Sequence, residues 1–354
     1  MREVYPKFYD SFKCLGGNCP HTCCQGWGVD IDKNTLARYK NVDGLYGAKL
    51  KQILANHKQF FKVGSSCPFL DKDGLCDIQK NLGESYLCDV CKKFPRVEYT
   101  YGNVVEHNLS PACIAVAEMI LNDGMELIEK DTDKIISTYS TFDTKFYPYM
   151  IKARNLIFEA LNTLSFDNAV MYILNFGEYL QGHFRVYSKL DEVIDSYKQK
   201  MGSFNESFSG KVSQKCMIKT IKEYLKLDML TPYIKDKLMA ALKLIYDGRI
   251  KTKDVVDLFN KYRDVNQFRN LTNYYIYKYF LRSVYDYSMC SRIKFSVYTT
   301  FVLILLTLFE SYTSGHIDKN AIAKNLEMMS REIEHNEDNI KKLNKFFTKK
   351  DLLK

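Results

Sequence analysis

Apolar residues recur every three or four positions through most of the chain after residue 115. Phe146, Met150, Ile157 and Leu161 share this spacing, which places them on one face of a helix. The pattern repeats from Val170 and predicts further helices at about 187–200, 214–228, 234–247, 253–262, 266–289, 293–312 and 317–347. No run in which apolar and polar residues alternate, as they do in a strand, is as clear as these helical patterns. The sequence therefore predicts a mainly α fold, built as a multi-helical array.

The first third of the chain differs from the rest in amino-acid composition. Between Cys14 and Cys113 lie nine of the 11 cysteines, four of the seven prolines and 10 of the 17 glycines. Glycine and proline favour turns and short elements, although a helix at about 33–58 is expected here too. We therefore expect a loop-rich, cysteine-rich metal-binding module at 1–113 and a helical domain at 114–354.

Charge and hydropathy narrow the class of protein. The net charge of +9, from 51 basic and 42 acidic residues, is mild for 354 residues and gives no support for nucleic-acid binding. The longest apolar stretch, 301–309, is shorter than the roughly 20 residues that span a membrane, so it predicts a buried core helix. The first six residues lack the apolar region of a signal peptide. We expect a cytoplasmic protein with no membrane or nucleic-acid partner.

The cysteines are the main chemical signal. They are spaced as Cys14-x4-Cys19-x3-Cys23-Cys24, followed by Cys67, Cys76, Cys88-x2-Cys91 and Cys113. A reducing cytosol disfavours disulfides, and thiolates this dense repel one another unless a cation lies between them. Zinc and iron–sulfur clusters both use four cysteines, and the spacing does not separate them. The sequence therefore predicts a cysteine-bound metal of either kind.

Some residues in and around this pattern have more than one interpretation. Because consecutive side chains of an extended backbone point to opposite sides, Cys23 and Cys24 are expected to serve different sites, or one of them to act as a nearby thiol or redox partner. His21 and His107 could replace a thiolate, but a surface histidine is the simpler interpretation. Cys216 and Cys290 lie in helical patterns and are expected to be small buried hydrophobes.

Several short motifs resemble those of one known family. They are Tyr5-Pro6, Phe12-Lys13-Cys14, the run Cys14-x4-Cys19-x3-Cys23-Cys24-x-Gly26-Trp27, Ile31-Asp32, Cys67-Pro68-Phe69-Leu70, Leu75-Cys76-x-Ile78-Gln79, Leu82-Gly83-Glu84 and Cys91-x2-Phe94-Pro95-Arg96. Together they resemble the flagellin lysine-N-methylase family, which belongs with a wider group of proteins that carry a zinc- or iron-chelating, cysteine-rich domain. The likeness continues at Asn270-Leu271-x2-Tyr274-Tyr275 and so covers essentially the whole chain.

This resemblance implies a cytoplasmic enzyme that methylates the ε-amino groups of flagellin lysines. It implies S-adenosylmethionine as methyl donor and a cysteine-bound metal centre, an iron–sulfur cluster of the 4Fe–4S type in preference to zinc. The metal ligands implied by the motifs are Cys14, Cys19, Cys23, Cys24, Cys67, Cys76, Cys91 and Cys113. Cys88 departs from the motif, which has another residue type three positions before Cys91, and it is either a spare thiol or a substitute ligand.

Methyl transfer to an amine makes demands that the sequence meets only in part. The amine must lose its proton, whose ordinary pKa is about 10.4, and must be aligned with the methyl donor. No glycine-rich nucleotide motif is present, and neither is the C-x3-C-x2-C spacing of radical chemistry on S-adenosylmethionine. Three residues are candidates for cofactor contacts: Trp27 could stack on adenine, Gln79 could donate to a cluster sulfur, and Arg96 could pair with a carboxylate. The sequence assigns no catalytic residue.

Two other functions fit the same residues. An iron–sulfur protein of electron transfer or redox sensing would show a reversible redox change without methyl transfer. A noncatalytic zinc module on a helical interaction scaffold would be colourless and would have no affinity for S-adenosylmethionine.

Overall fold

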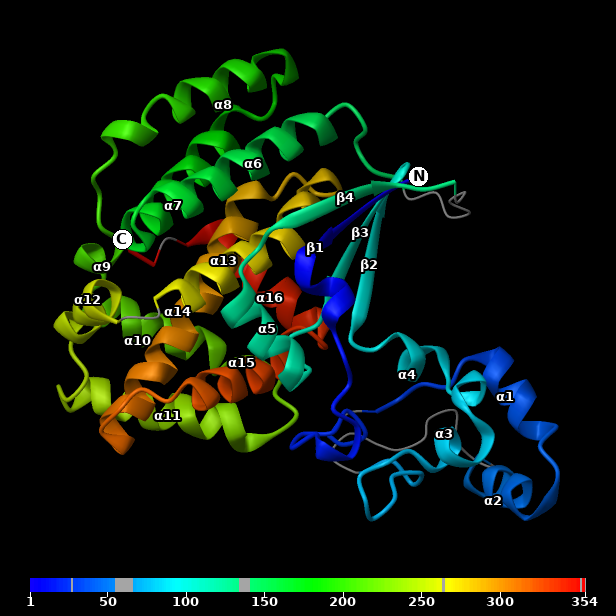
Figure 1. Ribbon diagram of the computed structural model, residues 1–354. Helices are drawn as coiled ribbons and strands as arrows, with labels where there is room; N and C mark the ends of the chain where they lie inside the picture. Colours follow the sequence, from blue (N-terminus) through cyan, green and yellow to red (C-terminus); the bar gives the residue numbers. More distant parts are fainter. Residues whose placement is uncertain (27, 55–65, 134–140, 263–264, 351, 354) are drawn as a thin grey trace.

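The computed structural model describes residues 1–26, 28–54, 66–133, 141–262, 265–350 and 352–353. Helices dominate this part of the chain, as the periodicity predicts (Figure 1). They are α1 (Lys33–Lys40), α2 (Gly44–Leu54), α3 (Asp77–Leu82), α4 (Asp89–Lys93), α5 (Ile114–Asp123), α6 (Tyr147–Thr163), α7 (Phe166–His183), α8 (Leu190–Lys198), α9 (Phe208–Lys211), α10 (Gln214–Tyr224), α11 (Pro232–Tyr246), α12 (Thr252–Lys261), α13 (Asn266–Tyr279), α14 (Met289–Ser314), α15 (Lys319–Ile333) and α16 (Glu337–Lys349). The mainly α fold is confirmed.

Three of the expected helices are interrupted in the structure, whereas the others differ at their ends. The pattern over 317–347 divides into α15 and α16, because the Asn336 side chain accepts from the N–H groups of Asp338 and Asn339 and so begins a new helix. The expected helix at 266–289 ends at Tyr279 and continues as a 3-10 turn. The one at 33–58 divides into α1 and α2 before Gly44, whose positive φ of 76° suits glycine.

A four-stranded sheet accompanies the helices, and it was not predicted. Its strands are β1 (Arg2–Pro6), β2 (Arg96–Tyr101), β3 (Val104–Leu109) and β4 (Leu127–Asp131), in the order β2-β3-β1-β4. The central strand β1 runs parallel to β3 and antiparallel to β4, so that Arg2 pairs with both Val104 and Asp131. The pairing of β1 joins segments about 100 residues or more apart, which local periodicity does not show. In contrast, β2 and β3 form a hairpin around Gly102-Asn103, and this turn was a local signal that the prediction missed.

Buried polar groups attach this sheet to the helical array. Arg154 of α6 makes two hydrogen bonds to Glu106 of β3, at 3.0 and 2.6 Å, and both side chains are almost completely buried. The Tyr277 hydroxyl of α13 donates to the Val4 carbonyl of β1 at 2.9 Å. The sheet thus depends on the helices that cover one of its faces.

The long helix α14 is the centre of the array. It packs against α7, α13 and α16, and residues 301–307 are buried. A Cβ on Gly177 of α7 would lie 2.9 Å from Ile293 Cδ1, so the glycine permits this close approach. Among the described helices α14 is the one long and apolar enough to cross a membrane, yet 89% of its most apolar window is buried. The expected core helix at 301–309 is confirmed.

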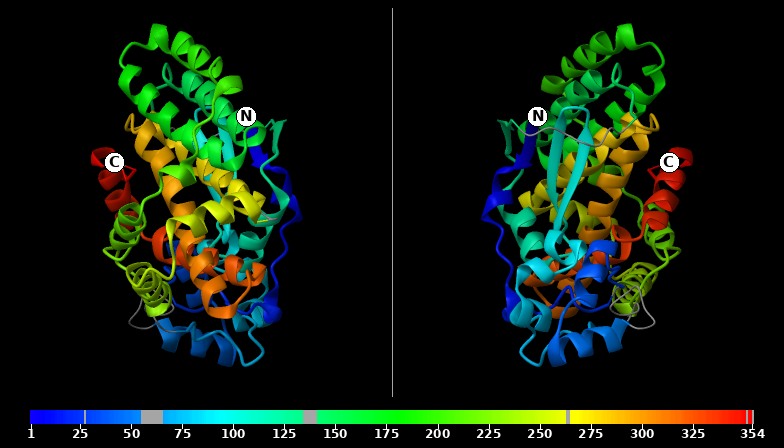
Figure 2. Two further views of the ribbon diagram at one scale, coloured as in Figure 1. Left: turned by 90° about the vertical axis from the view of Figure 1, so that its left-hand side faces the viewer. Right: turned by 90° about the vertical axis from the view of Figure 1, so that its right-hand side faces the viewer.

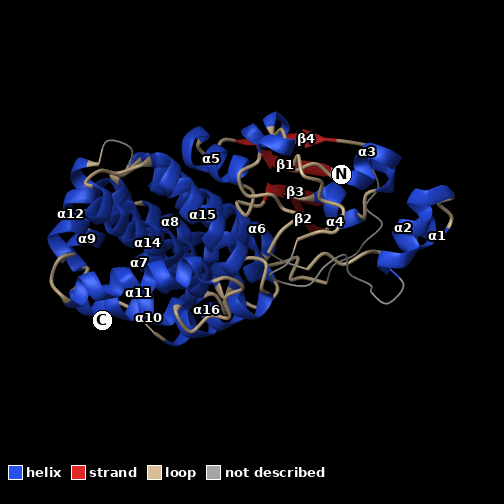
Figure 3. Cartoon of the chain, turned by 90° about the horizontal axis from the view of Figure 1, so that it is seen from below, coloured by secondary structure: helices blue, strands red, loops and turns tan. Residues whose placement is uncertain are grey.

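The apolar residues form two separate clusters. The larger cluster runs through the helical array and includes Phe8, Phe12 and Leu109 from the first third of the chain. The smaller cluster lies wholly within residues 29–91, around Tyr39, Leu50 and Phe69. Helices α1 to α4 surround it at the lower right of Figure 1, beneath the array in both views of Figure 2, and at the far side of the strands in Figure 3. The division at residue 113 stays a prediction.

We expect Arg154→Met to lower the free energy of unfolding by about 3–5 kcal/mol, because Glu106 would stay buried without its partner. Urea denaturation followed by circular dichroism measures this. The matched control is Lys152→Met on the same helix, which breaks exposed ion pairs with Asp191 and Asp195 and should cost less than about 1 kcal/mol. Equal losses in the two variants would contradict the role given to Arg154.

Candidate metal centre

The cysteines lie in loops and at the first turns of short helices. Three cysteines immediately precede helices: Cys76 before α3, Cys88 before α4 and Cys113 before α5. Burial raises the pKa of Cys76 and Cys113, and backbone N–H groups at the helix starts oppose this increase. The Cys67 N–H donates to the Cys24 carbonyl at 2.8 Å and joins two distant loops. Helix starts and loop pairing thus place the sulfur atoms.

Packing and charge divide these thiols into two sets. In the first, Cys19 and Cys113 pack against the larger apolar cluster; in the second, Cys67, Cys76, Cys88 and Cys91 pack around the smaller one. Electrostatic influence between thiols adds the remaining members, although Cys23 acts on both sides, since its charge also raises the pKa of Cys91. We call them set A, which is Cys14, Cys19, Cys23 and Cys113, and set B, which is Cys24, Cys67, Cys76, Cys88 and Cys91.

The two sets adjoin at Cys23 and Cys24. These residues lie in a turn rather than in an extended segment, so their side chains need not point to opposite sides. A hydrogen bond between the two thiols raises the pKa of Cys23 and lowers that of Cys24. Burial and the charges of Cys14 and Cys113 raise the pKa of Cys23 further. Whether the pair serves one site or two stays open.

A second thiol pair lies at the start of α4. Cys88 is completely buried, and its hydrogen bond with Cys91 lowers the pKa of Cys88 and raises that of Cys91. Burial raises the pKa of the neighbouring Cys67 to about 12, and the charges of Cys24, Cys76 and Cys88 add to the increase. Cys88, which departs from the family motif, therefore lies in the middle of set B. Its C-x2-C spacing at a helix start was the available signal.

The donor chemistry of these sets fits a cysteine-bound metal. All nine thiols are free of disulfides. Their charges raise one another's pKa, a cost that a cation bound among them would remove. In the described ranges no three His, Cys, Asp or Glu side chains converge as ligands of a single ion. The thiols of sets A and B have the donor chemistry to hold zinc or an iron–sulfur cluster, and their side chains would have to move together to bind it.

Charged side chains of α15 contact the loop that carries Cys14, Cys19 and Cys23, which we call the loop of set A. Glu327, whose side chain is 0% exposed, lies 2.8 Å from Arg331 and 2.7 Å from His21 Nδ1. Arg331 donates to the carbonyls of His21, at 2.6 Å, and Ala112, at 3.3 Å. Burial raises the pKa of Glu327 to about 7, and Arg331 opposes this increase. The carbonyls belong to segments just before Cys23 and Cys113, so one arginine joins both parts of set A.

The remaining candidate residues lie elsewhere. Trp27 is outside the described residues. Gln79 is exposed on α3, and the Arg96 guanidinium lies over the rings of Tyr9 and Phe12, 5.8 and 5.3 Å from their centroids. His107 lies on the sheet, with its Nδ1 3.2 Å from Glu98, and is thus engaged by carboxylates rather than thiols. The cofactor roles of Trp27, Gln79 and Arg96 stay predictions.

Comparison with known proteins places this architecture in a family. Residues 154–354, more than half of the chain, match the FliB lysine N-methylase C-terminal domain. The chain belongs to the FliB lysine N-methylase family. The family expected from the motifs is therefore confirmed, through its helical region. The cysteine sets precede the matched residues, but α15, which holds set A, lies within them.

Relatives in this family come from Salmonella. The lysine-N-methylases of Salmonella typhimurium strain LT2 and Salmonella choleraesuis strain SC-B67 are each 31% identical over 211 residues, which are 54% of this chain and 50% of theirs. The flagellar biosynthetic protein FliU of Salmonella muenchen is 36% identical over 148 residues, 37% of this chain and 86% of its own. The chain spans about half the length of the lysine-N-methylases. No solved structure matches it.

We expect Arg331→Met in this FliB-family chain to release the loop of set A, because the carbonyls of His21 and Ala112 and the buried Glu327 would lose their cationic partner. The loss of stability should be about 3 kcal/mol. Thiol labelling of metal-free protein, read by mass spectrometry, should show faster modification of Cys19, Cys23 and Cys113. Lys342→Met, at an exposed site on α16, is the matched control. Equal labelling rates in both variants would contradict the assignment.

Proposed function

We propose that the protein is a lysine N-methyltransferase that acts in the cytoplasm on flagellin, with S-adenosylmethionine as methyl donor. The match of residues 154–354 to the FliB lysine N-methylase C-terminal domain carries this proposal. The two Salmonella relatives named lysine-N-methylase support the reaction, and the relative named flagellar biosynthetic protein supports a flagellar substrate. Flagellin is the flagellar protein that the sequence motifs imply.

The contacts of α15 connect the cysteines to this function. Glu327 and Arg331 lie within the matched residues and bind the loop that carries set A. A centre at set A would therefore be attached to the helical region that matches the family. We propose that sets A and B hold an iron–sulfur cluster of the 4Fe–4S type in preference to zinc.

The residues around the thiols would supply the environment of the reaction. A cluster held by only three of the thiols would leave one iron with an open coordination position, at which a donor's amino and carboxylate groups could bind. The chain supplies partial burial, since set B packs against the smaller apolar cluster and set A against the larger one. Such burial excludes water and so favours the neutral amine that transfer requires.

A redox function is the second candidate, and one observation favours it. Cys88 and Cys91 form a C-x2-C pair at the start of α4, with the pKa of the first thiol lowered and that of the second raised. Pairs with this arrangement also carry out thiol–disulfide exchange where the first thiol is accessible, which at the completely buried Cys88 would require the segment before α4 to open. Reversible oxidation without methyl transfer would favour this function over the first.

We expect protein purified without oxygen to be brown, with iron and acid-labile sulfide in matched amounts. Cys67→Ala and Cys23→Ala, one from each set, should each lose the iron that its own set holds, whereas Cys290→Ala in α14 should keep all of the iron. Metal analysis and an absorption spectrum measure this. Colourless protein with zinc alone would contradict the cluster and favour a structural metal.

We expect the same preparations to transfer labelled methyl groups from S-adenosylmethionine to lysines of unmethylated flagellin. Cys67→Ala should lower the rate more than about tenfold, because losses of this order follow even when only the partners of metal ligands are changed. Cys290→Ala should leave it unchanged. No transfer by metal-replete wild-type protein would refute the methyltransferase function.

A further inference from the structure

A hollow on the helical array lies apart from the cysteines. It has a volume of about 450 Å³ and lies between α12, the C-terminal part of α14 and the segment before α15. This is the size of hollows that bind small ligands or single side chains. It lies within residues 154–354, the region that defines the family.

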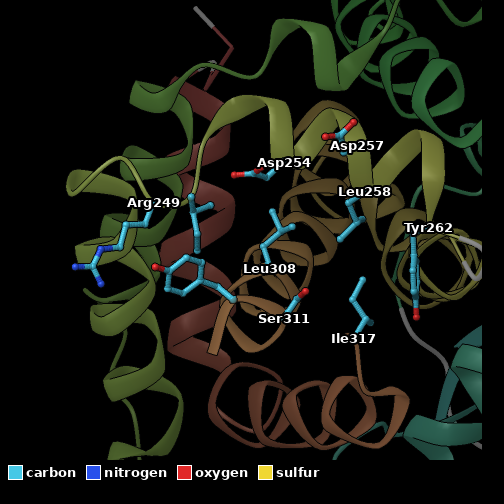
Figure 4. A pocket seen from close by; sticks show the side chains of 10 residues that line it. Arg249, Asp254, Asp257, Leu258, Tyr262, Leu308, Ser311 and Ile317 are labelled. Atoms are coloured by element: carbon cyan, nitrogen blue, oxygen red, sulfur yellow. The ribbon is translucent and has the colours of Figure 1, made fainter. Parts of the chain in front are cut away.

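The floor of the hollow is apolar. Figure 4 shows Leu258 of α12 and Leu308 of α14 facing the space between the two helices, with Ile317 beside them. Leu258 is buried, and Leu308 and Ile317 are half-buried. An apolar floor beneath a polar rim suits a ligand with an alkyl stem and a polar end.

The walls carry negative charge and aromatic rings. Asp254 and Asp257 are three residues apart on α12 and therefore share a helical face. Tyr262 and the exposed Tyr312 add two rings. Among the described lining residues Arg249 is the cation, and its guanidinium points away from the hollow in Figure 4. The two aspartates thus give the lining of the hollow a negative charge, whereas the net charge of the chain is +9.

These features match the chemistry of one side chain. Lysine has a flexible stem of four methylene groups, which covers apolar surface, and a terminal ammonium, which binds carboxylates and the faces of tyrosine rings. We propose that this hollow is a docking site for a lysine side chain of the polypeptide substrate. The proposal rests on the proposed function, since it assumes a lysine-bearing protein partner.

If methyl transfer takes place beside set A, as proposed above, the hollow is a recognition site and not the place of transfer. Ile317 lines the hollow and lies just before α15. Glu327, within α15, contacts His21 beside set A. From Lys319, where α15 begins, to Glu327 the helix rises roughly 12 Å, far more than the reach of a transferred methyl group. The docked lysine would therefore differ from the lysine that is methylated.

The test measures binding of a short peptide with one lysine, blocked at both ends, to the full-length metal-bound protein without methyl donor. Asp254→Asn and Asp257→Asn each remove one negative charge. The Lys251 N–H donates to Asp254 Oδ2 at 2.7 Å, and an asparagine at position 254 keeps an oxygen that can accept this hydrogen bond. Each substitution should weaken binding about fivefold, the value of one partly exposed ion pair. The matched control, Asp123→Asn at an exposed site on α5, should leave it unchanged. The same peptide with an acetylated lysine should bind poorly to all variants.

Two results would overturn the proposal. Equal peptide affinity in wild type, the double variant Asp254→Asn/Asp257→Asn and the control would show that the hollow binds no lysine. Loss of S-adenosylmethionine affinity in the double variant, with peptide affinity unchanged, would assign the hollow to the methyl donor instead. Because the peptide assay contains no donor, a failure of methyl transfer to flagellin leaves its result intact, and the two proposals fail separately.

Discussion

A carboxyl group and a guanidinium, those of Glu327 and Arg331, lie 2.8 Å apart between α15 and the loop of set A. Burial raises the pKa of Glu327 to about 7, so its carboxyl is only partly ionised near neutral pH. Burying an ion pair costs desolvation, and only close geometry and further hydrogen bonds offset that cost. Arg331 meets this condition by donating to the carbonyls of His21 and Ala112, which come from opposite ends of the cysteine-rich segment. The pair is satisfied only when both segments are docked on α15. The arrangement of set A therefore depends on the helical array.

The same helix passes this constraint on to the rest of the fold. Immediately after α15, Glu334 binds Lys278 and the Tyr279 hydroxyl of α13. Two residues earlier on α13, Tyr277 donates to the Val4 carbonyl of β1. A continuous series of buried polar contacts thus connects the cysteine loops, α15, α13 and the sheet. Because each of these groups would be left unpaired if its neighbour moved, the parts must fold together.

The sequence predicted what depends on local periodicity and missed what depends on long-range contact. The helical array and the core helix at 301–309 follow from spacing alone, since buried faces repeat every three or four residues. The pairing of β1, the pair Arg154–Glu106 and the pair Glu327–His21 join residues tens to hundreds of positions apart, and nothing near them in sequence marks them. The hairpin of β2 and β3 is local, and its Gly102-Asn103 turn could have been recognised. The cysteines were found by density, but their division into sets needed packing. An extended backbone was the wrong premise at Cys23 and Cys24, which lie in a turn.

The two sets rely on different supports, and this has a physical consequence for the centre that they would build. Set A takes its shape from the large core and from α15, so a folded helical array already holds it. Set B surrounds the smaller cluster of residues 29–91, a core too small to supply much stability by itself. Two of its thiols begin the short helices α3 and α4, which need tertiary support to form. A metal bound at set B would therefore contribute to folding, whereas one at set A would bind to thiols on segments that the helical array already holds.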